Sequence, residues 1–304
     1  MKEKLCFIVF LLIGYCSSIS TAAKVDTTAI HLQCMQLASM GDSILRGSSD
    51  SVRMASNIKF REGMDTIVKM PASFQYSFAV VKNLSALTSD DDRFRIYTWM
   101  VPTNRGMKYE YFGYVQVYNE EKKSVKIYKL REQDFPNNET AEFIRLTDST
   151  WYGALYYKIV HKRYDKKDQY MLLGWKGKDV FTTRKVIDNI AITPSKVEFG
   201  KPVIKGEGKK AKSRIILEYN ASANVSVKYN EEERMIVYDH LSSSDPKPES
   251  KGMFALYGPD LTYDGLKFKN GFWFIEKDVQ IRNTTDPSNK KPELNHDLRM
   301  QRKE

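Results

Sequence analysis

The chain has 304 residues and a formal net charge of +10. Its hydrophobic fraction of 41% and charged fraction of 28% are ordinary for a globular protein, which excludes a disordered or fibrous class. The lysines are spread among acidic residues, and no helix-turn-helix or RNA-binding signature is present. We therefore expect no nucleic-acid partner.

Residues 1–23 have the pattern of a signal peptide. Lys2 and Lys4 precede an apolar run, and a stretch of small residues follows, with cleavage expected after Ser20 or after Ala23. The apolar run is about half as long as a membrane-spanning helix requires. We therefore expect an exported protein, periplasmic or extracellular, with no transmembrane helix in the mature chain.

A lipid anchor at Cys16 is the alternative for this segment. The run Ile13-Gly14-Tyr15-Cys16 resembles a bacterial lipobox, although the residue before the lipidated cysteine is normally small and Tyr15 is large. Cleavage after residue 20 or 23 would leave Cys34 as the single cysteine of the mature chain. One cysteine cannot close an internal disulfide or build a thiolate zinc or iron–sulfur site, so we expect Cys34 to be a buried, inert thiol.

Residues 24–70 are expected to form a helical region. Apolar residues recur near helical spacing from Ile30 to Leu45, after a candidate cap at Thr27 or Thr28. The polar run 47–50 interrupts the pattern, and 52–58 and 63–68 are expected to add short helices before Pro71 closes the region.

Strand patterns dominate residues 71–281. Alternating runs include 93–101, 108–118, 124–130, 151–162, 169–175, 213–219, 225–229, 234–240, 261–268 and 272–279. The stretch 141–145 favours a short helix, and 181–192 fits either a strand pair or a short helix. Lys269-Asn270-Gly271 is typical of a hairpin turn. We predict a mainly β, α+β fold: an antiparallel sandwich or meander with lobe breaks near 135–150 and 242–252. Residues 282–304 are expected to be a polar, disordered tail.

Several segments resemble a family of uncharacterised secreted proteins of Bacteroidetes-type bacteria, with a match from about residue 70 to 280. They are Phe94-Arg95-Ile96-Tyr97-Thr98-Trp99, Tyr111-Phe112-Gly113, Trp151-Tyr152-Gly153-Ala154-Leu155-Tyr156-Tyr157, Leu172-Leu173-Gly174-Trp175, Thr183-Arg184-Lys185-Val186-Ile187-Asp188 and Tyr257-Gly258-Pro259-Asp260. The resemblance implies an exported β-rich protein. It implies no activity, because none is established for the family.

One cluster has the residue types of a catalytic site. The sequence contains no nucleophile elbow, H-E-x-x-H, P-loop or dinucleotide fingerprint. Asp239 and His240 end one strand, and Asp260 and Asp264 lie near the start of another. Paired carboxylates with an imidazole would suit glycoside hydrolysis, or calcium binding through hard oxygen ligands. The competing interpretation is that these aspartates cap turns. Apart from this possible calcium site, we expect no metal site.

Aromatic side chains suggest a ligand-binding face instead. If these rings are exposed on one concave face, they would stack on sugars, and Arg184 would hold an anion. The competing interpretation is that the rings lie in the core and that Arg184 is solvated. The ring candidates are Trp151, Tyr152, Tyr156 and Trp175. We expect a non-enzymatic binding or cell-envelope accessory module, with a glycan or an envelope protein as partner. The alternative is a secreted hydrolase acting on glycans.

Overall fold

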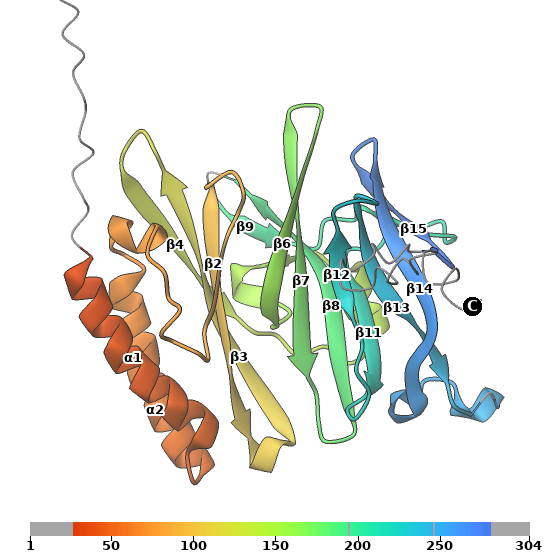
Figure 1. The fold of residues 1–304 in the computed structure, drawn as a ribbon, viewed down its shortest axis with the longest axis horizontal. Helices are drawn as coiled ribbons and strands as arrows, with labels where there is room; N and C mark the ends of the chain where they lie inside the picture. The colour runs from red at the N-terminus through yellow and green to blue at the C-terminus, as the bar shows by residue number, and fades with distance from the viewer. Residues whose placement is uncertain (1–26, 194, 246, 281–304) are drawn as a thin grey trace, which may run out of the picture.

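The computed structural model describes residues 27–193, 195–245 and 247–280. A helical hairpin and three β-sheets follow one another along the longest axis of the molecule (Figure 1). Three apolar clusters of buried side chains occupy the spaces between these four layers. Within the described residues, no helix is both long and apolar enough to cross a membrane.

The helical hairpin covers the outer face of the first sheet. It consists of α1 (Thr28–Arg46) and α2 (Asp50–Ile67), and the short 3-10 helix η1 (Pro71–Phe74) follows. Ser49 starts α2, because its hydroxyl accepts a hydrogen bond from the Val52 backbone N–H at 3.3 Å. Cys34 lies on the buried face of α1 as a free thiol, as expected from its apolar surroundings.

The first sheet is an antiparallel meander that is buried on both faces. Its order is β1 (Ser85–Thr88), β2 (Phe94–Thr103), β3 (Lys108–Asn119) and β4 (Ser124–Arg131), with η2 (Asn104–Gly106) between β2 and β3. Alternation along β2 sends Tyr97 and Trp99 toward the helices, and Phe94 and Ile96 toward the second sheet. The Trp99 indole N–H donates to the Asn57 side-chain oxygen at 2.8 Å and so joins the sheet to α2.

The second sheet forms the middle of the molecule. A connection with α3 (Asn138–Phe143), β5 (Leu146–Thr147) and η3 (Asp148–Thr150) leads into it. Its strands run in the order β5, β9 (Val197–Phe199), β8 (Thr182–Ile192), β7 (Lys167–Gly177), β6 (Leu155–Tyr164). The strand β11 (Ile215–Asn220) pairs with the first half of β8, and β9 pairs with its end.

The third sheet closes the far end of the stack. Its order is β10 (Ile204–Lys205), β15 (Phe272–Glu276), β14 (Tyr257–Lys269), β13 (Met235–Ser243) and β12 (Val227–Asn230), with η4 (Pro248–Ser250) and η5 (Phe254–Leu256) between β13 and β14. The Asn270-Gly271 hairpin is confirmed: both residues have positive φ, 51° and 79°, as a type I′ turn requires.

The expected fold class is confirmed, since an antiparallel β-rich body follows a helical N-terminal region. Two local predictions are corrected. The expected short helices 52–58 and 63–68 form one continuous helix, α2, and 181–192 forms the single strand β8. The predicted signal peptide, the Cys16 anchor and the predicted tail lie outside the described residues.

Candidate functional site

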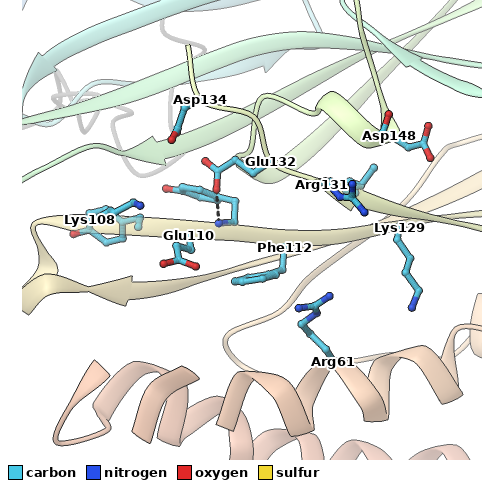
Figure 2. A pocket seen from close by; sticks show the side chains of 13 residues that line it. Arg61, Lys108, Glu110, Phe112, Lys129, Arg131, Glu132, Asp134 and Asp148 are labelled. Carbon is cyan, nitrogen blue, oxygen red and sulfur yellow. Dashed lines mark hydrogen bonds between the residues drawn. The ribbon is translucent and has the colours of Figure 1, made fainter. Parts of the chain in front are cut away.

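A wide hollow of about 620 Å³ opens between α2, the paired strands β3 and β4, and η3. Lys108, Glu110 and Phe112 alternate along β3 and therefore face the same side of the sheet. In Figure 2, Arg61 reaches from α2 toward Phe112, while Asp134 and Asp148 lie on the opposite side of the hollow. The guanidinium carbon of Arg61 is 5.3 Å from the centre of the Phe112 ring, a cation–π contact.

Glu132 holds the floor of the hollow in place. One carboxylate oxygen accepts the Tyr111 backbone N–H at 2.8 Å, and the other accepts the Lys176 ammonium at 2.5 Å. Lys176 also donates to the Tyr152 carbonyl at 2.7 Å and is buried. Burial lowers the pKa of Lys176, and the Glu132 carboxylate opposes that effect. This pair joins the first sheet to the second, so its role is structural.

Several charged side chains on the walls make no direct polar contact with other described residues. Among the described residues, no ion pair or hydrogen bond involves the charged groups of Lys108, Glu110, Arg131, Asp134 or Asp148. Asp134 acts only at a distance, through its charge, on the Lys176 ammonium. The hollow therefore presents unpaired cations and unpaired carboxylates to the same solvent-filled space, beside aromatic rings.

No family model, curated protein or solved structure matches this chain. What the protein binds or transforms must therefore be inferred from its own side chains.

The expected aromatic face is wrong for three of its four rings. Trp151, Tyr152 and Tyr156 are buried in the cluster between the first and second sheets. The Trp151 indole N–H donates to the Tyr156 hydroxyl at 3.1 Å, so even the polar atoms of these two rings are satisfied internally. Their bulk fills the space between two sheets, and only Trp175 remains partly exposed.

Arg184 is not free to hold an anion. Its Nε donates to a carboxylate oxygen of Glu218 at 2.8 Å, and Glu218 is buried. The same carboxylate accepts Lys178 at 2.6 Å and Asn138 at 2.8 Å. Arg184 is therefore one of several donors around a buried acid, which corrects both its predicted ligand role and the solvated alternative.

The structure brings together His240, Asp264 and Asp260. The His240 Nδ1 lies 2.9 Å from Asp264 Oδ2, and its Nε2 lies 3.9 Å from Asp260 Oδ2. The hydrogen bond with Asp264 raises the pKa of His240, and Asp260 adds to that effect. A register shift in the β13–β14 pairing occurs between Asp239 and Leu241, at the position of His240.

Asp239 takes no part in that group. Its Oδ2 accepts the Ser226 backbone N–H at 2.7 Å, which fastens β13 to the start of β12. The competing interpretation, that these aspartates cap turns, fits Asp260 instead, because Asp260 Oδ1 accepts the Thr262 backbone N–H at 3.1 Å. Both oxygens of Asp264 are also engaged, one with His240 and the other with the Asp278 backbone N–H at 3.4 Å. Asp239 and Asp264 therefore offer calcium few free oxygens.

A second imidazole group surrounds His161. Asp91, His161 and Asp168 place candidate ligand atoms within 4.8 Å of one another. Arg93 lies 3.6 Å and Arg163 lies 3.7 Å from Asp168, and these cations already balance its charge. We therefore interpret this group as a contact that joins the β1–β2 turn to the β6–β7 hairpin, and not as a metal site. Its members come from segments distant in sequence, so no local pattern indicates it.

Proposed function

We propose that the protein is an exported, non-enzymatic binding module whose ligand site is the charged hollow between α2, β3, β4 and η3. The observation that carries the proposal is the set of unpaired charges of both signs on its walls. The residue pattern of the first 23 positions supports export.

A glycan is the ligand class that this surface fits best. Carboxylates such as Glu110 and Asp134 only accept hydrogen bonds, and cations such as Lys108 and Arg131 only donate them. A sugar hydroxyl does both, so a polyhydroxylated chain satisfies the two kinds of wall without carrying a compensating charge. The rings of Tyr109 and Phe112 add flat apolar surface beside them.

Affinity electrophoresis of the mature protein tests this proposal. The probes are soluble xylan and pectin cast into native gels, with sedimentation on isolated peptidoglycan as a third assay. We expect at least one of them to retard or capture the protein. Arg131→Ala and Glu110→Gln should each weaken that binding by about tenfold or more, because a charged hydrogen bond is worth about 1.5–3 kcal/mol.

Matched controls lie in the exposed turn between β3 and β4. Lys122→Ala and Glu120→Gln remove the same charges outside the hollow, so they are expected to leave binding unchanged. If no polysaccharide is bound, or if the control and hollow variants weaken binding equally, this site assignment fails.

A secreted glycan hydrolase is the second candidate, and the His240 group favours it. An imidazole in contact with one carboxylate and close to another has the components of acid–base catalysis. Release of reducing ends from the same xylan and pectin should then fall at least a hundredfold in Asp264→Asn and His240→Ala. Absence of release by the unaltered protein would remove this candidate and leave the binding proposal standing.

A further inference from the structure

A second pocket, of about 400 Å³, lies where the end of α1 approaches both the first and the second sheet. Its walls are mainly apolar. Leu84 precedes β1, Met100 comes from β2, Leu155 from β6 and Trp175 from β7. The volume is within the range of small-molecule sites, which runs from about 300 to 1,000 Å³.

The rim of this pocket exposes apolar surface to solvent. Leu45, at the end of α1, is 37% exposed, and Tyr157 is 41% exposed. The Tyr157 hydroxyl donates to the Val227 carbonyl at 2.9 Å, so the ring is held in position although it is partly exposed. A fixed, partly exposed aromatic ring that lines the pocket together with leucine and methionine side chains favours an apolar ligand body.

The charged side chain that lines the pocket and the one that lies over its Tyr157 ring are both lysines. Lys82 lines it and makes no ion pair within the described residues. Lys185 places its ammonium 5.0 Å from the centre of the Tyr157 ring, and within those residues it too has no acidic partner. No aspartate or glutamate lines the pocket. Burial lowers the pKa of Lys185, as expected for a cation that lacks a neighbouring anion.

We propose that this pocket binds a single-chain anionic amphiphile such as a medium-chain fatty acid, with its tail against Leu84, Met100 and Trp175 and its carboxylate near Lys82. Apolar walls select the tail by burial of its surface. The lysines select a negatively charged head group, because a neutral or cationic head would leave them without a counter-charge. The site shares no lining residue with the charged hollow, so the proposal is independent of the proposed function.

Isothermal titration calorimetry with decanoate, at concentrations below its micelle formation, tests the proposal on the mature protein. We expect saturable binding of one decanoate per chain and clearly weaker binding of the uncharged analogue decanol. Leu45→Glu places a carboxylate at the rim and should weaken decanoate binding about tenfold, through lost apolar contact and charge repulsion. Lys82→Gln should weaken it about two- to fivefold.

Leu32→Glu is the matched control. Leu32 is an exposed leucine of the same helix that does not line the pocket, so this variant is expected to bind decanoate as the unaltered protein does. Circular dichroism establishes that both glutamate variants are folded. Absence of saturable binding, equal affinity of the Leu45→Glu and Leu32→Glu variants, or decanol binding as tight as decanoate would each overturn the proposal.

Discussion

Asp188 and Arg214 form an ion pair in the interior of the protein, with 3.2 Å between Asp188 Oδ1 and Arg214 Nε and both side chains fully buried. Asp188 Oδ1 also accepts the Asn189 backbone N–H, and Arg214 donates to the Ala141 and Ile144 carbonyls. The pair therefore fastens β8 to the α3 connection.

Removing one partner of this pair should be severely destabilising. In Asp188→Ala the Arg214 guanidinium stays buried without its counter-charge, at an expected cost of about 3–5 kcal/mol in the free energy of unfolding. Urea denaturation followed by circular dichroism measures the loss. Asp165→Asn, in the β6–β7 turn, serves as control and should change stability by less than about 0.5 kcal/mol. A loss below about 1 kcal/mol in Asp188→Ala would contradict a structural role for the pair.

Glu218 should make stability depend on pH in acid. Burial would raise the pKa of its carboxyl, but hydrogen bonds and charges from Lys178, Arg184 and Asn138 lower that pKa to about 2. A carboxyl whose pKa is lowered by folding stabilises the protein fully at pH values above 4.5, the ordinary pKa of a glutamate carboxyl in the unfolded chain. That stabilisation is lost as the pH falls through the folded-state pKa. The protein should therefore lose stability between about pH 4.5 and pH 2.

The variant Glu218→Gln isolates this effect, because glutamine has no proton to bind. Its free energy of unfolding should vary less steeply with pH across that window than that of the unaltered protein, when both are measured by urea denaturation at a series of pH values. Glu120→Gln, in an exposed turn, should keep the steeper dependence. Parallel curves for Glu218→Gln and the unaltered protein would show that another carboxyl governs acid stability.

Gly41 in α1 should respond to substitution in opposite directions depending on Asn83. A methyl group at Gly41 would overlap the Asn83 side-chain amide, whose oxygen and nitrogen have no hydrogen-bond partner in the described part of the chain. Gly41→Ala should therefore destabilise the protein by about 1–2 kcal/mol, since the overlap outweighs the gain in helix propensity. In an Asn83→Ala background the same change should stabilise it by up to about 1 kcal/mol. A thermal-unfolding double-mutant cycle measures the coupling, and additive effects would contradict the contact.

Much of the fold follows from local pattern, and most of the site does not. The alternation of Arg95, Tyr97 and Trp99 against Phe94 and Ile96 indicates a strand with two distinct faces. It does not indicate that helices cover one face and a sheet the other, because that depends on segments far apart in sequence. The same limit applies to Trp151, Tyr152 and Tyr156, because the sheet that covers these rings comes from another part of the sequence.

The charged hollow did have a local signal. Lys108, Glu110 and Phe112 occupy alternate positions of one predicted strand, and two cationic residues, Lys129 and Arg131, do so at the end of the next. Charged residues on one face of paired strands indicate a solvent-facing surface at that place. Their approach to Arg61 of α2 and Asp148 of η3 required the tertiary structure.

The protonation of His240 should depend on Asp264, the aspartate with which its imidazole forms a hydrogen bond. The hydrogen bond with Asp264 raises the His240 pKa above 6.5, with a further contribution from Asp260. An imidazole whose pKa is raised by folding stabilises the protein fully at pH values below its pKa in the unfolded chain. That stabilisation is lost as the pH rises through its pKa in the folded protein. In Asp264→Asn the largest cause is removed, so the His240 pKa should fall toward 6.5 and the stability lost on raising the pH should diminish. Titration of the imidazole Cε1 proton by NMR measures the pKa directly.

The control variant Asp165→Asn removes the same charge elsewhere in the protein and should leave the His240 titration unchanged. An unaltered His240 pKa in Asp264→Asn would mean that the contact seen between these side chains does not govern the protonation of the imidazole, and the acid–base role considered for this group would lose its physical basis.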